Sequence, residues 1–279
     1  MNIGIIGYGY VGRALARFFS KVHRVTIYDK FQERYNSSAL KTSINECDFA
    51  FVAVPTPVAA GTPNCDTSAV EDVLSWSTVA LCIKSTIPPG TTDRLASLYG
   101  SQLVFSPEYI GESIGHPWKD VSDCGFLILG GSGALAELVT TAYRSIDETI
   151  KVVSTSSKTA ELCKYMENAF LATKITFVNQ FYDIATTMGV DFDELVRLWQ
   201  LDRRIGESHC KVTMERGFGG RCLPKDLQAL VGFAKPFTST EFLEAVLSYN
   251  DKIRLQLASE SNLGLRHWND SPVTCSDRK

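Results

Sequence analysis

The stretch NIGIIGYGYVG at residues 2–12 decides the fold. It begins with a short apolar run, typical of a strand buried on both faces, and a helical pattern follows over residues 13–19. Gly7 permits a tight turn, Gly9 lets a ligand approach the backbone, and Gly12 lets the helix pack closely on the strand. Because N–H groups at a helix N-terminus attract phosphate, the stretch predicts a dinucleotide site.

An acidic residue ends the second predicted strand, residues 25–28. Asp29 follows it, where a carboxylate can accept both hydroxyls of an adenosine ribose and repel a 2′-phosphate. NAD is therefore expected rather than NADP, although Lys30 and Arg34 lie close enough to soften that preference. Alternatively, the glycines serve only a turn and Asp29 only closes a strand. Strand, glycines, helix, strand and acid in series favour the cofactor site.

The rest of the first half repeats short β-rich runs and helical patterns. Turn residues such as Pro55, Pro88 and Gly90 follow the strands. This rhythm predicts an α/β domain with a doubly wound, Rossmann-type parallel sheet covered by helices. The expected strands are residues 2–6, 25–28, 49–54, 79–84, 103–105 and 126–129.

The pattern changes at the Ser/Thr cluster of residues 154–157, which offers N-caps for a long helix that runs without Gly or Pro to Met188. Further helices are expected over residues 192–200, 225–233 and 241–259. The predicted domains are therefore a dinucleotide-binding domain (1–155), an all-helical domain with a long central helix (156–260) and an irregular tail (261–279). Apolar residues at helical spacing predict that the long helix is buried on more than one side. They are Leu162, Tyr165, Met166, Ala169, Phe170, Ala172 and Ile175.

Composition excludes several classes of function. The 279 residues are 44% hydrophobic with a formal net charge of −3, which fits a globular chain and disfavours nucleic acid as a partner. No apolar stretch approaches the roughly 20 residues of a membrane span, and no cationic apolar leader is expected. The eight cysteines are scattered without a CxxC pair and the four histidines lack metal-site spacing. A cytoplasmic protein with free thiols and no metal is expected.

The segment GFGGRCLPKD at residues 217–226 carries the most specific chemical signal. Its glycines bring flexible backbone to a cysteine, and Pro224 is typical of the first turn of a helix. Cys222 is thus predicted at a helix N-terminus, where the helix dipole and Lys225 favour a nucleophilic thiolate. The alternative is an inert, buried cysteine.

Polar residues also share a face of the predicted long helix. Lys164 and Asn168 are four apart, and Glu161 lies one turn earlier. A lysine beside an asparagine can stabilise an alkoxide or position a water, whereas a polar stripe facing solvent is the alternative. Two loops at strand ends, residues 84–92 and 106–112, add Glu108 and Glu112 as a candidate base and substrate contact; loop carboxylates can equally be hydrated.

Together these motifs resemble the UDP-glucose/GDP-mannose dehydrogenase family, whose NAD-dependent members oxidise a nucleotide sugar at C6 to the uronic acid. From residue 2 to about 255 they occur in the family's order. The resemblance implies Cys222 as the thiol nucleophile, Lys164 and Asp226 for the alkoxide and a catalytic water, and Asn168 for substrate or intermediate. It places Thr86 and Glu108 near the hydrolytic water. Implied cofactor-binding residues are Gly7, Gly9, Tyr10, Val11, Gly12, Asp29, Pro55, Thr56 and Thr86, and implied substrate-binding residues are Glu112, Lys164, Asn168, Gly219 and Gly220.

The reaction implied is a four-electron oxidation, with UDP-glucose to UDP-glucuronate, a polysaccharide precursor, as first choice. A thiohemiacetal and then a thioester form on Cys222. The resemblance also implies a homodimer that pairs the long helices of two chains.

Two departures leave alternatives open. Only about twenty residues separate Asp29 from Phe49, and the chain stops soon after residue 259, whereas family members continue into a domain that holds much of the UDP moiety. One hypothesis is that Arg266 and Trp268 in the tail replace some of those contacts, by pairing with a phosphate and stacking on uracil. The alternatives are a single-step β-hydroxyacid-type dehydrogenase, which has no use for Cys222, and a non-catalytic NAD-binding remnant.

Overall fold

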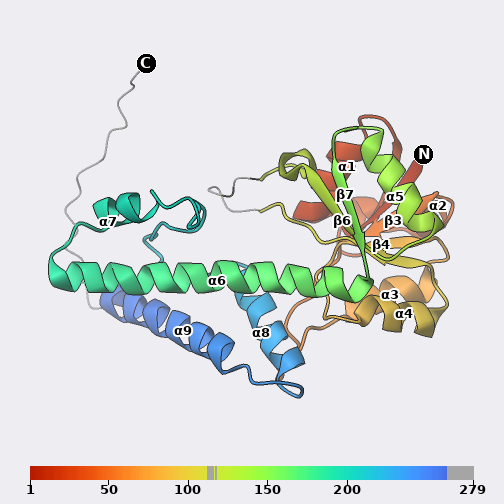
Figure 1. The fold of residues 1–279 in the computed structure, drawn as a ribbon. Coiled ribbons are helices and arrows are strands. Elements are labelled where there is room, and N and C mark those ends of the chain that lie inside the picture. The colour runs from red at the N-terminus through yellow and green to blue at the C-terminus, as the bar shows by residue number, and fades with distance from the viewer. Residues whose placement is uncertain (112–115, 117, 263–279) are drawn as a thin grey trace. The chain divides into compact units, whose positions relative to one another are not determined.

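The computed structural model describes residues 1–111, 116 and 118–262 (Figure 1). The chain forms two compact units, each of which is described by itself. The first contains residues 1–170 and 221–240, and the second contains residues 171–220 and those from 241 onward. All strands described belong to the first unit.

The first unit is built on a seven-stranded sheet with the order β2-β1-β3-β4-β5-β6-β7. Strands β1 to β5 are parallel, β6 pairs antiparallel to β5 only through Phe105 and Gly130, and β7 is parallel to β6. The predicted α/β class is confirmed, with a mostly parallel sheet rather than a wholly parallel one. The strands are β1 (Asn2–Ile6), β2 (Arg24–Tyr28), β3 (Phe49–Val52), β4 (Leu81–Ile83), β5 (Leu103–Phe105), β6 (Phe126–Gly130) and β7 (Lys151–Thr155).

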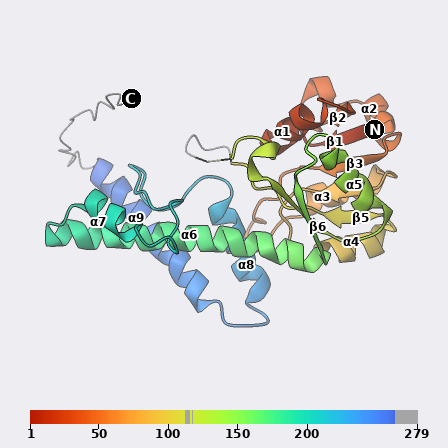
Figure 2. The same cartoon turned by 45° about the horizontal axis from the view of Figure 1, so that its top comes forward.

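Helices cover both faces of this sheet (Figure 1; Figure 2). On one face α1 and α5 pack against Ile3, Ile5 and Phe51, and on the other α2, α3 and α4 pack against Ile6, Val52 and Ile83. These strand residues are fully or almost fully buried, as expected for strands covered on both sides. The helices are α1 (Tyr10–Phe19), α2 (Ser38–Asn45), α3 (Ser68–Trp76), α4 (Thr91–Tyr99) and α5 (Ala134–Arg144), with short 3-10 turns η1 (Glu33–Tyr35) and η2 (Val121–Cys124).

Strand β7 was not predicted from the sequence. It lies at one edge of the sheet, and none of its five residues is buried, so it lacks the apolar run that marks the other strands. The change from mixed to all-helical structure still falls at residues 155–157, where β7 ends and α6 begins.

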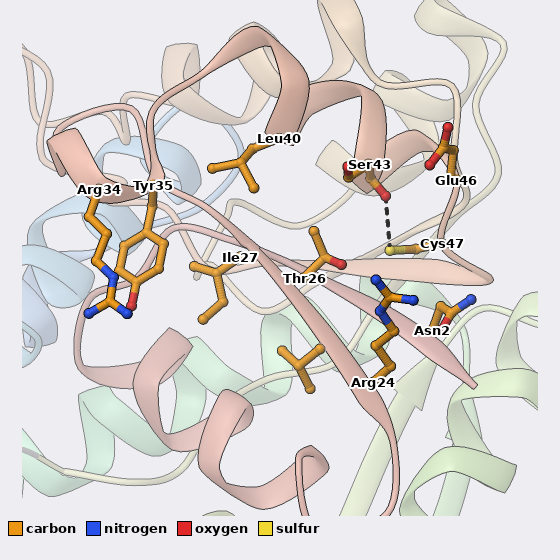
Figure 3. A pocket seen from close by; sticks show the side chains of 11 residues that line it. Asn2, Arg24, Thr26, Ile27, Arg34, Tyr35, Leu40, Ser43, Glu46 and Cys47 are labelled. Atoms are coloured by element: carbon orange, nitrogen blue, oxygen red, sulfur yellow. Dashed lines mark hydrogen bonds between the residues drawn. The ribbon is translucent and has the colours of Figure 1, made fainter.

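Strand β2 forms the opposite edge of the sheet. A doubly wound sheet of the 3-2-1-4-5-6 order has one more strand beyond this position, but here η1 and α2 lead from β2 directly to β3 on the far side of β1. A cavity of about 450 Å³ follows the outer edge of β2. In Figure 3, Arg34 and Tyr35 lie at one end of it, and Arg24 and Glu46 lie at the other.

The remaining helices are α6 (Ser157–Met188), α7 (Phe192–Trp199), α8 (Leu223–Ala234) and α9 (Glu241–Asn262). The prediction that α6 is buried on more than one side is wrong for three of its apolar residues. Leu162, Met166 and Phe170 are 48%, 71% and 62% exposed, whereas Tyr165 and Ala169 are buried. Helical spacing predicts that a helix has an apolar face, but it does not show whether the rest of the same chain covers that face.

Candidate active site

The glycine turn, residues 7–12, joins β1 to α1 as the sequence predicts. Gly7 has a positive φ of 93°, and an added Cβ would lie 2.5 Å from the Ala53 carbonyl oxygen, so this position requires glycine. An added Cβ at Gly12 would collide with the Gly7 carbonyl oxygen at 1.9 Å. At Gly9 it would meet nothing within 4 Å, and this open backbone opposite a helix N-terminus fits a pyrophosphate.

Asp29 follows β2, and the residue is only 8% exposed. Oδ2 accepts a hydrogen bond from the Tyr8 backbone N–H at 2.6 Å and another from Gln32 Nε2 at 3.1 Å. Oδ1 accepts from the backbone N–H groups of Phe31 at 2.8 Å and Gln32 at 3.2 Å. The sequence placed this carboxylate at the expected point but did not indicate that its own chain surrounds it with donors.

The two cations that follow Asp29 have other partners. Lys30 pairs with Asp72 at 3.2 Å, and the Arg34 guanidinium lies over the Tyr35 ring at 5.5 Å from the ring centroid. Both side chains therefore have contacts of their own, and the role of Asp29 in the choice of NAD over NADP stays a prediction.

The loops after β3 and β4 meet beside the glycine turn. Thr56 is buried and its hydroxyl donates to the Thr86 carbonyl oxygen at 2.7 Å, while Pro55 next to it is exposed. Tyr10, in the glycine turn, donates from its hydroxyl to the Gly111 carbonyl oxygen at 2.7 Å. Strand order reverses between β1 and β3, and ligands of doubly wound sheets bind at that point.

Glu108, the predicted general base, forms a buried ion pair with Lys84 at 3.2 Å. Its other oxygen accepts from the backbone N–H groups of Tyr109 and Ile110. Burial alone would lower the pKa of Lys84, but the Glu108 carboxylate outweighs it and raises that pKa. This partner was not predictable from the sequence, because a lysine at a strand end is usually an exposed cation. Whether Glu108 acts as a base stays a prediction.

On α6, the polar residues singled out from the sequence face inward. Glu161, Lys164 and Asn168 are 0%, 8% and 5% exposed, so the alternative of a solvent-facing polar stripe is wrong. Lys164 Nζ lies 4.6 Å from the centroid of the Tyr109 ring and 3.4 Å from a Glu167 carboxylate oxygen. This face is therefore brought against the loop that carries Glu108 and Tyr109.

Glu161 has a structural task that the sequence did not reveal. Its carboxylate accepts hydrogen bonds from the Gly90 and Thr92 backbone N–H groups at 2.5 and 2.8 Å, and from the Thr92 hydroxyl at 2.6 Å. It thereby caps the N-terminus of α4, whose own N-cap residue is a glycine without a side chain. Burial raises the pKa of this carboxyl, and the bonds from Thr92 and Gly90 oppose the increase.

Asp226 joins α8 to α6. It is 2% exposed, accepts a 2.5 Å hydrogen bond from Asn168 Nδ2, and forms an ion pair with Lys225. Asn168 and Asp226 are 58 residues apart, and the sequence placed both near the reaction without predicting this contact. The ammonium group of Lys225 pairs with Asp226, whereas the sequence predicted that it favours the thiolate of Cys222.

Cys222 lies at the start of α8, as predicted. It is the N-cap residue, Pro224 stands in the first turn, and the Cys222 carbonyl oxygen accepts from the Asp226 N–H at 2.9 Å. The residue is exposed, so the alternative of a buried cysteine is wrong. All seven described cysteines are free thiols. Exposure together with the positive end of a helix is the environment of a reactive thiol.

Two groups near this site were not singled out from the sequence, the Cys65 thiol and the Tyr165 hydroxyl. Cys65 Sγ lies 3.9 and 3.8 Å from the carbonyl oxygens of Thr56 and Thr86. Burial raises the pKa of both groups, and the Asp226 charge adds to the increase. The available signal was the position of Tyr165 between Lys164 and Asn168.

Three further predicted substrate contacts are Glu112, Gly219 and Gly220. Glu112 lies outside the described residues, as do Arg266, Trp268 and the tail beyond residue 262. Gly219 and Gly220 belong to the second unit, where an added Cβ at Gly219 would lie 2.9 Å from Arg254 Nη1.

Among the residues described, no group of three or more metal-binding side chains occurs. Over the same residues, no helix combines the length and apolar character needed to cross a membrane.

Comparison with known proteins identifies the family. The model of the UDP-glucose/GDP-mannose dehydrogenase family's NAD binding domain matches residues 30–147, and that of its central domain matches residues 158–252. The Bacillus subtilis protein YtcA, provisionally named a UDP-glucose 6-dehydrogenase, is 31% identical, with 90% of this chain and 68% of that protein covered. The UDP-glucose 6-dehydrogenase of Rhizobium meliloti is 32% identical, with 76% and 52% covered.

A solved structure supports the same assignment. The UDP-glucose dehydrogenase of Pyrobaculum islandicum superposes with a TM-score of 0.81 at 26% identity, and the match covers 94% of this chain and 71% of that one. The glycine turn, Asp29 and the matched domains define an NAD-dependent dehydrogenase. The chain belongs to the UDP-glucose/GDP-mannose dehydrogenase family, whose members act on nucleotide sugars.

Proposed function

We propose that this protein oxidises the C6 alcohol of a nucleotide sugar to the uronic acid in two successive NAD-dependent steps, with UDP-glucose as the first substrate to test. The observation that carries the proposal is the position of Cys222. It is an exposed thiol at the start of α8, one helical turn before Asp226, and Asp226 is bound to Asn168 of α6. A single-step dehydrogenase requires a cofactor turn and polar residues on a helix, but no thiol at this place.

The residues fit the steps of that reaction. NAD, when bound, accepts a hydride from C6. Lys164, buried and cationic, stabilises the sugar oxygen as negative charge develops on it. The Cys222 thiolate adds to the aldehyde carbon, and the thiohemiacetal formed still carries a hydrogen that leaves as the second hydride. The remaining thioester reacts with water, which breaks the carbon–sulfur bond and releases the acid and the thiol.

Water must be held next to the thioester. Asp226 is anchored by Asn168 on one side and by Lys225 on the other, so its carboxylate is fixed in place to orient a water at Cys222. Glu108 is proposed as the base for that water, and its pairing with Lys84 holds its side chain in place. Thr86, Glu112, Gly219 and Gly220 remain proposed contacts of the water or the sugar.

The proposed working form is a cytoplasmic homodimer. The exposed apolar residues Leu162, Met166 and Phe170 lie at i, i+4 and i+8 on α6, so they form one continuous stripe. Such a stripe is typical of a helix that a partner covers, and the long helix of a second copy is the proposed partner.

The stoichiometry of NADH formation tests the reaction. The protein is incubated with NAD and a panel of UDP- and GDP-sugars, and we expect two NADH per sugar consumed, with acid as the product. Cys222→Ser replaces the thiol with a weak nucleophile and is expected to abolish acid formation. Cys47→Ser makes the same change beside the β2 edge cavity and is expected to leave the stoichiometry at two.

The other outcomes identify the alternatives. One NADH per substrate, with full activity retained in Cys222→Ser, would establish a single-step dehydrogenase. NAD binding without turnover of any sugar in the panel would establish a non-catalytic NAD-binding protein.

A further inference from the structure

The Asp29 carboxylate has no acceptor direction left for a ligand. Two carboxylate oxygens offer about four lone-pair directions. Here Oδ2 receives the Tyr8 N–H and Gln32 Nε2, and Oδ1 receives the N–H groups of Phe31 and Gln32, at distances of 2.6 to 3.2 Å. An adenosine ribose that binds to this carboxylate must therefore displace one of these four donors.

Only one of the four donors can leave without moving the main chain. Three are backbone N–H groups, one in the glycine turn and two in the turn after β2. The fourth is the side-chain amide of Gln32, which is half-buried and can rotate into solvent. The amide is held in place by a second bond, from Nε2 to the Tyr8 carbonyl oxygen at 2.9 Å.

The chemistry of the two contacts fixes the orientation of this amide. Both the Asp29 carboxylate oxygen and the Tyr8 carbonyl oxygen are acceptors, so only the NH₂ end of the amide can lie between them. Nε2 thus spans the glycine turn and the end of β2. A ribose hydroxyl that donates to Asp29 Oδ2 would make the same kind of bond to the same atom.

We propose that the side-chain amide of Gln32 is an internal competitor of the adenosine ribose, and that NAD binds to Asp29 by displacing it. Since the exchange replaces one hydrogen bond to Asp29 by another and also breaks the Gln32 bond to Tyr8, the net gain from the ribose hydroxyl is reduced. Gln32 therefore lowers the affinity for NAD, and it does so at the adenosine ribose and not at the nicotinamide. The inference depends on NAD binding and not on the chemistry at Cys222.

Direct titration with NAD tests this, with no sugar present. Gln32→Ala removes the competitor, and calorimetry is expected to show a Kd about five- to tenfold lower than that of the wild-type protein. Gln32→Leu keeps most of the side-chain volume but has no donor, and its Kd is expected to fall as well. Agreement between the two variants would assign the effect to the donor and not to the space that it fills.

A ligand pair locates the effect at the ribose. ADP and 2′,3′-dideoxy-ADP share adenine and phosphates, but only ADP carries the hydroxyls that compete with Gln32. Gln32→Ala is expected to improve ADP binding and to leave the binding of the dideoxy analogue unchanged.

Several results would overturn the inference. The first is an unchanged or higher Kd for NAD in both Gln32 variants, when their melting curves match that of the wild-type protein. The second is an equal decrease of the Kd for ADP and for its dideoxy analogue in Gln32→Ala. Absence of NAD binding by the wild-type protein would also overturn it. Loss of sugar oxidation in a protein that still shows the Gln32 effect would contradict only the proposed reaction.

Discussion

In the first turns of α6, the buried face is polar and the exposed face is apolar, which is the reverse of an ordinary surface helix. The inner face holds Glu161, Lys164 and Asn168, all buried, whereas the outer face holds apolar residues that are 48–71% exposed. A surface helix normally buries its apolar stripe and exposes its charges. Buried polar groups are costly unless each has a partner, and all three inner residues have one.

The two faces are suited to different tasks. Packing does not require a lysine, a glutamate and an asparagine inside one unit, but a site that handles charge does. The outer face is the converse, because exposed apolar surface is stabilised only when something covers it. Changes on the inner face should therefore affect chemistry or folding, and changes on the outer face should affect association.

The largest expected effect concerns Lys164. Lys164→Met keeps a side chain of similar length without the charge, and kcat for NADH formation from the nucleotide sugar should fall about 10²- to 10³-fold. Lys158→Met, on the same helix but exposed, is the matched control and should leave kcat unchanged. Equal kcat in the two variants would remove Lys164 from the proposed reaction.

Glu161 should dominate the stability of the inner face. Glu161→Ala leaves the N–H groups of Gly90 and Thr92 and the Thr92 hydroxyl without their acceptor, and the free energy of unfolding should fall by about 2–4 kcal/mol. Glu161→Gln keeps an acceptor oxygen and should lose much less. Chemical denaturation of both variants measures the difference, and similar losses would show that the capping contacts are not what the carboxylate supplies.

On the outer face the effect should appear in association alone. Met166→Glu combined with Phe170→Glu places charge in the stripe, and the dimer dissociation constant measured by sedimentation should rise about 30-fold or more. The free energy of unfolding of the monomer should change by no more than about 0.5 kcal/mol per substitution, since both side chains are exposed. Leu98→Glu, at a 64% exposed position on α4, should not affect association.

The pH dependence of stability should separate Glu161 from its amide variant. A carboxyl whose pKa is raised in the folded state binds its proton more tightly there than in the unfolded chain. Its contribution to stability is therefore greatest below the unfolded pKa of about 4.3 and is lost as pH rises through the raised pKa. Denaturation of wild type and Glu161→Gln across this window should show the wild type losing stability relative to the variant as pH rises. A pH-independent difference would mean that the pKa of Glu161 is not raised.

Local chemistry explains what the sequence predicted well. The glycine turn and Cys222 at a helix start each depend on residues within about ten positions, and Asp29 follows the glycine turn at the spacing of about twenty that a dinucleotide site requires, so their spacing contains the information. The long helix was also predictable, because no Gly or Pro interrupts it before Met188.

Long-range contacts explain what it missed. The pairing of Asn168 with Asp226, and of Lys84 with Glu108, depends on which side chains the fold brings together. Strand β7 lacks an apolar run because it is an exposed edge. The exposed stripe of α6 has the spacing of a core, and the spacing alone does not distinguish a face covered by the chain itself from one that is left exposed.

The smallest expected effect tests the one exception on the inner face. The Tyr165 hydroxyl is buried and makes no hydrogen bond of ordinary geometry to any described residue, although Cys65 and Asp226 lie near it. Tyr165→Phe removes only this hydroxyl. Because the hydroxyl is buried without a good partner, its removal should leave the free energy of unfolding unchanged or raise it by up to about 1 kcal/mol, measured by chemical denaturation. Tyr143→Phe is the matched control. The Tyr143 hydroxyl accepts a hydrogen bond from Lys84 at 3.5 Å, so its removal should lower the free energy of unfolding. A loss of more than about 1 kcal/mol in Tyr165→Phe would show that its hydroxyl is partnered after all, and that the inner face of α6 contains no unsatisfied group.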